Sequence, residues 1–185
     1  KRPQDFGWSQ PKLDGIRCIA TKDGLFTRAG KAINTCGHIE HDLKEFFKEE
    51  PDIILDGELY NHELKADFNK ITSLVRKVKP TEEEAQECSE LVQYWIYDMY
   101  DTMDPTEIFS FRIQFLNREI MTLYKALEVV ETAYCNNQNL LDRKYSEYTE
   151  AGYEGQMVRN DTPYENKRSK NLLKRKEFIT EEFDV

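Results

Sequence analysis

The segment Gln10-Pro11-Lys12-Leu13-Asp14-Gly15-Ile16-Arg17 places a lysine ahead of an aspartate two residues on, a glycine three residues on and an arginine five residues on. A lysine amine acts as a nucleophile only when it is neutral, and nearby cations lower its pKa toward that state. The segment is therefore a candidate nucleophile loop, provided that the rest of the chain supplies groups that bind phosphate and metal.

A β-hairpin is predicted directly after this segment. Ile16–Thr21 is rich in β-branched residues, Lys22-Asp23-Gly24 contains an Asp-Gly turn, and Leu25–Thr27 can form the returning strand. Lys12 would then lie in a turn before the hairpin. Arg28, at the end of the second strand, is a candidate phosphate contact, with an ordinary surface turn as the alternative.

Two carboxylates flank a glycine at the end of a predicted buried strand. Asp52–Leu55 runs into Asp56-Gly57-Glu58, and the alternation of a strand places Asp56 and Glu58 on one face. On that face both could approach a metal ion or a ribose. A turn with incidental acidic residues is the alternative.

A basic cluster interrupts an acidic chain. The net charge is −9, which argues against a simple nucleic-acid-binding domain, yet six basic residues and no acidic one lie between Lys167 and Lys176. If Leu172–Phe178 is a strand, Lys174 and Lys176 share a face. The cluster suits an anionic ligand, although a solvated run of charge explains the segment alone equally well.

The remaining pattern alternates helices with strands. The most regular helical spacing of apolar residues is that of Phe111–Glu131, and Thr81 has the position of a helix N-cap followed by acidic residues. A further strand, rich in aromatic residues, is predicted over Leu91–Tyr100. The predicted helices are His41–Glu49, Ala66–Val78, Thr81–Glu90, Phe111–Glu131 and Asn139–Gly152.

Length and composition indicate one soluble domain. The chain has 185 residues, 39% of them hydrophobic, and neither an apolar stretch that could span a membrane nor a signal sequence. Its four cysteines form no C-x-x-C pair, which favours free buried thiols in a reducing compartment. His38 and His41 could begin a metal site, but no third ligand follows at a suitable spacing.

Five blocks in order carry a resemblance to a known family. They are Lys12-Leu13-Asp14-Gly15-Ile16-Arg17, Asp56-Gly57-Glu58, Tyr94–Asp98, Glu154-Gly155-Gln156-Met157-Val158-Arg159 and Leu173-Lys174-Arg175-Lys176. The first matches the pattern K-x-D-G-x-R, which is weak alone but specific when the other blocks follow. Over about residues 8 to 178, the chain resembles the adenylation (nucleotidyltransferase) domain of ATP-dependent DNA ligases, most like the compact viral or phage forms.

This resemblance implies an α+β fold of the nucleotidyltransferase (ATP-grasp-like) type, with antiparallel β-sheets flanked by helices around a nucleotide cleft. Residues 1–185 would form one adenylation domain. The family expects an oligonucleotide-binding (OB-fold) barrel after residue 185, and Glu181–Val185 resembles its first residues. We therefore expect the isolated domain to bind ATP but to self-adenylate and seal nicks poorly.

The activity that the resemblance implies is phosphodiester bond formation. Lys12 would attack the α-phosphate of ATP and carry AMP as a covalent adduct, with Mg²⁺ or Mn²⁺ as the metal. AMP would then pass to a 5′-phosphate in nicked duplex DNA, and the 3′-hydroxyl would displace it. We expect a monomer that works inside the cell, either in the cytoplasm of a bacterium or host or in a eukaryotic nucleus.

The resemblance also assigns residues to roles, with Lys12 as the catalytic residue. The metal ligands would be Glu58 and Glu154. Tyr97 would stack on adenine where the family often has Phe. The nucleotide contacts would be Gln10, Lys12, Arg17, Arg28, Glu58, Tyr97, Glu154, Lys174 and Lys176, and the DNA contacts would be Asp14, Arg17, Arg28 and Arg159.

Three alternatives differ in substrate or in activity. An RNA ligase or a GTP-using mRNA capping enzyme would also use Lys12, although the block ending in Arg159 favours a DNA ligase over a capping enzyme. A non-catalytic nucleotide- or DNA-binding module is a third possibility, against which the intact set of lysines and glutamates argues. NAD⁺-dependent ligases are disfavoured because the chain shows no NMN-binding region or cysteine zinc motif.

Overall fold

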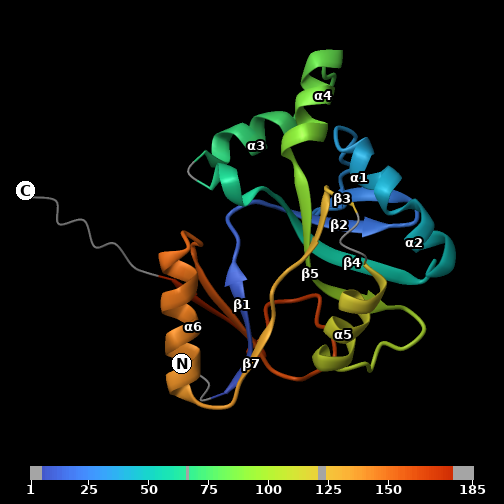
Figure 1. Cartoon of the computed structure of the whole chain (residues 1–185). Helices are drawn as coiled ribbons and strands as arrows, with labels where there is room; N and C mark the ends of the chain where they lie inside the picture. Colours follow the sequence, from blue (N-terminus) through green and yellow to red (C-terminus); the bar gives the residue numbers. More distant parts are fainter. Residues whose placement is uncertain (1–5, 66, 121–123, 177–185) are drawn as a thin grey trace, which may run out of the picture.

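Two β-sheets flanked by helices make up the protein. The computed structural model describes residues 6–65, 67–120 and 124–176. Figure 1 shows the two sheets side by side, with β1 and α6 in one half and β2–β5 with most of the helices in the other. This mixed architecture with mainly antiparallel pairing confirms the predicted fold class.

The larger sheet has five strands in the order β3-β2-β4-β5-β6. All of its neighbours pair antiparallel except β5 and β6, which are parallel. Thr21 pairs with Gly24 across the turn, so the predicted hairpin is confirmed. The strands are β2 (Ile16–Thr21), β3 (Gly24–Thr27), β4 (Ile53–Tyr60), β5 (Gln93–Asp101) and β6 (Leu127–Val129).

The smaller sheet has four antiparallel strands in the order β7-β1-β8-β9. Lys12 is the last residue of β1 and lies opposite Gly155, so it ends a strand, and the prediction that it lies in a turn was wrong. Pairing with distant strands on both sides makes this segment extended. The strands are β1 (Gly7–Lys12), β7 (Ala133–Cys135), β8 (Gly155–Arg159) and β9 (Leu172–Lys176).

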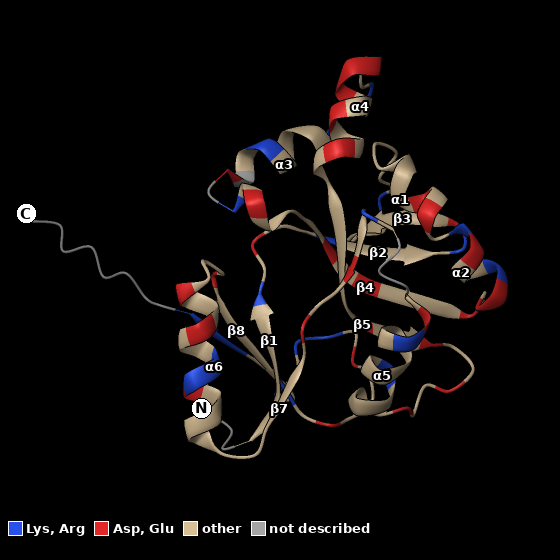
Figure 2. Ribbon diagram, in the orientation of Figure 1, with Lys and Arg blue, Asp and Glu red and all other residues tan. Residues whose placement is uncertain are grey.

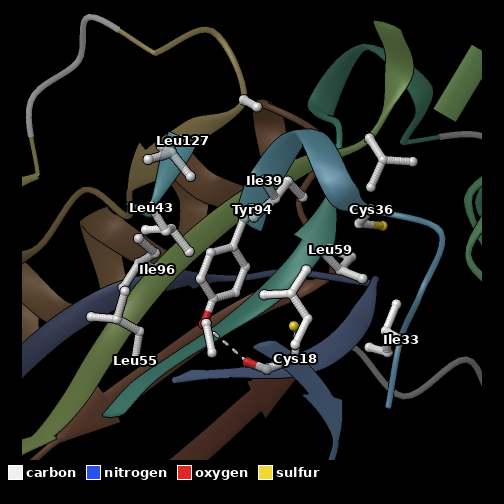
Figure 3. Packing of buried hydrophobic residues seen from close by; sticks show 14 of the residues in the cluster. Cys18, Ile33, Cys36, Ile39, Leu43, Leu55, Leu59, Tyr94, Ile96 and Leu127 are labelled. Atoms are coloured by element: carbon white, nitrogen blue, oxygen red, sulfur yellow. Dashed lines mark hydrogen bonds between the residues drawn. The ribbon is translucent and has the colours of Figure 1, made fainter. Parts of the chain in front are cut away.

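The main hydrophobic core lies in the half of the five-stranded sheet. Figure 3 shows the ring of Tyr94, which is fully buried, among aliphatic side chains, with its hydroxyl donating to the carbonyl oxygen of Cys18 at 3.1 Å. A Cβ at Gly57 would lie 2.6 Å from the Tyr94 ring. Glycine in the Asp56-Gly57-Glu58 block thus lets this ring pack directly on β4.

Most predicted helices are confirmed with shifted ends. Thr81 caps α4 as predicted, and a full capping box with Glu84 closes its first turn. The segment predicted as one helix over His41–Glu49 contains two short helices that meet at Leu43. The helices are α1 (Gly37–Asp42), α2 (Lys44–Glu49), the 3₁₀ helix η1 (His62–Leu64), α3 (Phe68–Val75), α4 (Glu82–Leu91), α5 (Phe109–Glu119) and α6 (Gln138–Glu150).

The prediction of one long helix over Phe111–Glu131 was wrong. Helix α5 ends before Ile120, whose backbone is extended, and Leu127–Val129 forms β6 beside β5. Both Ile120 and Leu127 are buried, so the apolar spacing of the sequence marks core positions of two different elements. Pairing with β6 satisfies backbone groups on the outer side of β5, which outweighs helical propensity here.

Several smaller predictions concern the ends of segments, the cysteines and membrane-spanning helices. Three predicted positions lie outside the described residues. They are the strand end at Glu177–Phe178, the start of the barrel at Glu181–Val185, and Ala66, the first residue of a predicted helix. All four cysteines are free and buried, as predicted. Among the described residues, no helix is long and apolar enough to cross a membrane.

Candidate active site

A cavity of about 330 Å³ lies between the two sheets and contains most of the predicted site residues. Tyr97 is a half-buried part of its wall, and Arg28 is exposed at its rim. Asp14 is exposed and does not line it. The predicted residues in its wall are Gln10, Lys12, Arg17, Arg28, Glu58, Tyr97, Arg159 and Lys174.

Lys12 enters the cavity from the end of β1, with its side chain 16% exposed. The backbone N–H of Glu154 donates to the carbonyl oxygen of Lys12 at 3.1 Å, which fixes the start of β8 against the end of β1. Lys12 Nζ is in direct contact with Glu154 Oε2, and Lys176 Nζ lies 3.3 Å from Glu154 Oε1. One carboxylate therefore bridges two of the predicted lysines.

The pKa of Lys12 is lowered from its ordinary value. Burial has the largest effect, because it disfavours the ammonium form. Glu58 and Asp14 raise the pKa, whereas Lys174 and Lys176 lower it. Lys174 and Lys176 thus act in the direction predicted from the sequence, and they come from β9 on the far side of β8. In Figure 2 this strand, which leads into the grey C-terminal trace, is blue for its basic residues, whereas α4 carries red acidic positions.

Glu58 lies on β4 opposite Arg17, and its carboxylate accepts a hydrogen bond from the backbone N–H of Gly15 at 3.0 Å. Burial raises the pKa of Glu58 to about 7, although this hydrogen bond and Lys12 oppose the shift. A Cβ at Gly15 would lie 2.5 Å from the carbonyl oxygen of Leu59. Glycine is therefore needed for the segment after Lys12 to lie this close to β4.

Glu58 and Glu154 are suitable ligands for Mg²⁺, which does not need a site built entirely from protein side chains. Among the described residues, no cluster of three or more His, Cys, Asp or Glu side chains could hold a metal ion. His38 instead contacts the carbonyl oxygen of Val92 at 2.8 Å. Mg²⁺ normally binds one or two carboxylates and completes its shell with water and substrate phosphates, so two separate glutamates near Lys12 fit it.

Arg17 forms a forked ion pair with Asp56. Its Nε and Nη2 donate to the two carboxylate oxygens at 2.9 and 2.8 Å. The hydroxyl of Tyr164 donates to the same carboxylate at 2.8 Å. Asp56 is 4% exposed, so these donors replace water around its carboxylate, and Arg17 is held at the cavity wall.

A second buried ion network forms part of the cavity wall. Asp98 accepts from Arg112 Nε at 2.8 Å and from Arg159 Nη1 at 2.9 Å, and all three side chains are at most 11% exposed. Arg159 Nε also donates to Gln10 Oε1 at 2.7 Å. The amide nitrogen of Gln10 donates to Tyr97 O and Thr132 Oγ1. Gln10 and Arg159 thus connect the first strand to β5.

The sequence interpretation did not assign Asp98, Arg112 and Tyr164 to the site, although all three line the cavity. Asp98 is the last residue of the matched block Tyr94–Asp98, and Tyr164 lies between two matched blocks. Arg112 lies within a segment interpreted only as a helix. The sequence did offer one signal for Arg112: a charged residue lies among apolar ones, on the helix face that packs into the core. A buried arginine needs an acidic partner, which points to an ion pair.

A family profile and two curated relatives point to the same family. The profile of the family described as "ATP dependent DNA ligase domain" matches residues 1–176. The DNA ligase of Enterobacteria phage T4 is 26% identical over 93% of this chain and 44% of its own length. The DNA ligase of Haemophilus influenzae is 27% identical over 97% of this chain and 61% of its own length.

Solved structures show the same fold. A structure from a study of Lig E DNA ligases superposes with a TM-score of 0.71 and 25% identity, covering 94% of this chain and 62% of that one. An adenylated Chlorella virus DNA ligase gives a TM-score of 0.72 at 24% identity, covering 96% of this chain and 64% of that one. The chain thus spans about half to two thirds of the length of the proteins that it resembles.

Proposed function

Because the chain belongs to the ATP-dependent DNA ligase domain family, we propose that it forms a covalent lysyl-AMP at Lys12 and passes the AMP to DNA. The observation that carries this proposal is the position of Lys12. It ends a strand inside a cavity, touches Glu154, and has Glu58 and Lys174 close enough to shift its pKa.

The first step requires a neutral Lys12 amine. Its nitrogen attacks the α-phosphorus of ATP, a P–N bond forms, and the P–O bond to the leaving pyrophosphate breaks. Glu154, already in contact with Nζ, is placed to take the amine proton. Lys174 and Lys176 would offset the negative charge that develops on the phosphate oxygens.

A divalent metal ion would be held by Glu58 and Glu154. When bound, Mg²⁺ neutralises phosphate charge and helps to keep the Lys12 amine neutral. The chain's own groups orient the nucleotide. Tyr97 offers a ring for the adenine base, and Arg17 and Arg28 offer N–H donors to ribose or phosphate.

In the second half of the reaction, AMP passes to a DNA 5′-phosphate and the adjacent 3′-hydroxyl then displaces it. We propose Asp14, Arg17 and Arg28 as contacts to the nicked duplex. Asp14 and Arg28 are exposed beside the cavity, where a duplex could reach them. Arg159 is only 9% exposed and is bound to Gln10 and Asp98, which favours a role in holding the site's shape.

The direct test is the intact mass of the full-length protein after incubation with ATP and Mg²⁺. We expect a single AMP adduct in the wild type and none in Lys12→Ala or in Lys12→Arg, because a guanidinium cannot become neutral at ordinary pH. Lys22→Ala, which removes an exposed lysine from the hairpin turn, serves as the control. An adduct that persists in Lys12→Ala would contradict the proposal.

The same assay separates the alternatives. A capping-type enzyme would form the adduct with GTP in preference to ATP. An RNA ligase would transfer AMP to an RNA 5′-phosphate faster than to nicked DNA. If the wild type binds ATP and forms no adduct under any of these conditions, the non-catalytic module is the correct interpretation.

A further inference from the structure

The connection between β8 and β9, residues 160–171, joins the four-stranded sheet to the half of the molecule that contains the five-stranded sheet and α5, called here the larger half. Asp161 accepts from the backbone N–H and hydroxyl of Ser110 at 2.7 and 2.9 Å, at the start of α5. The carbonyl oxygen of Thr162 accepts from Arg112 at 3.1 Å. This connection, which we call the bridging loop, is therefore attached to the larger half next to the cavity.

Tyr164 makes the third attachment, and it does so at a functional side chain. Its hydroxyl donates to Asp56 Oδ2 at 2.8 Å and accepts from Arg17 Nη2 at 3.3 Å. Its ring packs against Tyr100, with centroids 5.6 Å apart, and lies 5.9 Å from the Arg112 guanidinium carbon. The hydroxyl therefore closes a three-membered ring of hydrogen bonds with Asp56 and Arg17.

This arrangement leaves part of Arg17 available. Nε and Nη2 are used by Asp56 and Tyr164, whereas Nη1 has no hydrogen-bond partner in the described part of the chain. The side chain lines the cavity and is 31% exposed. A guanidinium fixed on one edge by a buried carboxylate presents its remaining N–H groups in a defined direction, which suits an oxyanion.

We propose that Tyr164 is a positioning residue that fixes the Arg17–Asp56 pair so that Arg17 Nη1 binds a phosphate oxyanion in the cavity. The inference rests on the proposed function, because it concerns the phosphates of that reaction. The oxyanion comes either from the nucleotide or from the DNA 5′-phosphate. Without the hydroxyl, Asp56 Oδ2 loses one of its two donors, and Arg17 Nη2 loses its second acceptor. The guanidinium of Arg17 is then free to rotate relative to Asp56, and the direction of Nη1 is no longer fixed.

The test uses Tyr164→Phe in the full-length protein, because this change removes the hydroxyl and keeps the ring. One arm measures adduct formation against ATP concentration. The other measures AMP transfer from pre-adenylated protein against the concentration of nicked duplex with a 5′-phosphate. We expect the half-saturating concentration to rise about 10-fold in one arm, as for a lost hydrogen bond to a charged group, with a smaller change in the maximal rate. The affected arm identifies the source of the oxyanion.

Tyr100→Phe, which removes a hydroxyl from the adjacent ring, is the matched control and should change neither arm. Arg17→Lys should affect the same arm as Tyr164→Phe, and the double variant should lose less than the two single losses combined, because both changes act on one contact. Thermal unfolding of each variant checks that the fold is kept.

The outcomes separate this inference from the proposed function. Unchanged half-saturating concentrations in both arms for Tyr164→Phe, or a fall in maximal rate alone, would overturn the positioning role while leaving adduct formation intact. A wild-type protein that forms no adduct would contradict the proposed function, and this inference would fail with it.

Discussion

Lys12 and Glu154 are in direct contact across adjacent strands, although 142 positions separate them in the sequence. The contact exists because Glu154 immediately precedes β8, whose first residue pairs with Lys12 at the end of β1. The sheet itself thus places the proposed nucleophile and the carboxylate in contact with it, and strands position side chains more precisely than loops do. Lys176 reaches the same carboxylate from β9.

The pH dependence of adduct formation should report the cations around Lys12. Lys174 lowers the pKa of Lys12, so Lys174→Gln should raise that pKa and leave less neutral amine at a given pH. The rising limb of the pH–rate profile should move to higher pH, and the rate at neutral pH should fall by roughly 100-fold because the proposed phosphate contact of Lys174 is also lost. Lys170→Gln, in the same basic cluster, should leave the profile in place. A rate loss without a pH shift would show that Lys174 acts on phosphate alone.

Glu58 should make the free energy of unfolding depend on pH. Burial raises its pKa from the ordinary 4.5 to about 7, so the folded state holds a proton that the unfolded state releases. Stability is therefore lost as the pH rises from about 4.5 to about 7. Glu58→Gln keeps an oxygen for the Gly15 N–H and removes the charge, so it should stabilise the protein by about 3 kcal/mol at pH 8 and change little near pH 4.

Urea unfolding at the two pH values measures this difference, with Glu63→Gln, an exposed glutamate, as the control. Equal stability of Glu58→Gln and the wild type at pH 8 would mean that the Glu58 charge is already compensated in the folded state.

Local signals in the sequence predicted the local structure. The Asp-Gly turn after Lys22 determined the hairpin, and Thr81 with Glu84 determined the start of α4, because in each case the groups that interact lie within a few residues. The five blocks identified the family, and with it the residues that gather around Lys12. These contacts depend on chemistry that the sequence displays.

Long-range pairing accounts for what the sequence did not reveal. The apolar spacing of Phe111–Glu131 continues through the end of α5, and only the edge of β5 selects a strand at Leu127–Val129. Likewise, nothing near Asp98 in the sequence shows that two arginines, 14 and 61 positions away, share its carboxylate. Tyr164, 108 positions from Asp56, was not predicted as a site residue for the same reason.

Gly15→Ala should separate the positioning of the nucleophile from the stability of the fold. A Cβ there would lie 2.5 Å from Leu59 O and 2.8 Å from Glu58 Cγ, so the loop after Lys12 must move away from β4. A displacement of about 1 Å costs roughly 100-fold in rate, and we expect that loss in single-turnover adduct formation. Gly37→Ala, where no described atom lies within 4 Å of the added carbon, is the matched control and should retain the rate. Wild-type rates in Gly15→Ala would mean that the loop adapts without moving Lys12.

Asp98→Asn should destabilise the protein far more than its small change in shape suggests. Asp98 is 2% exposed and neutralises Arg112 and Arg159, which are themselves buried. With an amide in its place, two guanidinium groups keep their charge without a carboxylate, and such a loss costs about 3–5 kcal/mol. Denaturant unfolding should show this loss, whereas Asp142→Asn, which breaks a surface pair with Arg175, should change stability much less. Arg159 also donates a hydrogen bond to Gln10, two residues before Lys12. The fraction of Asp98→Asn protein that remains folded should therefore form the adduct more slowly at saturating ATP. If its stability equals that of the wild type, then water, rather than Asp98, stabilises the two arginines.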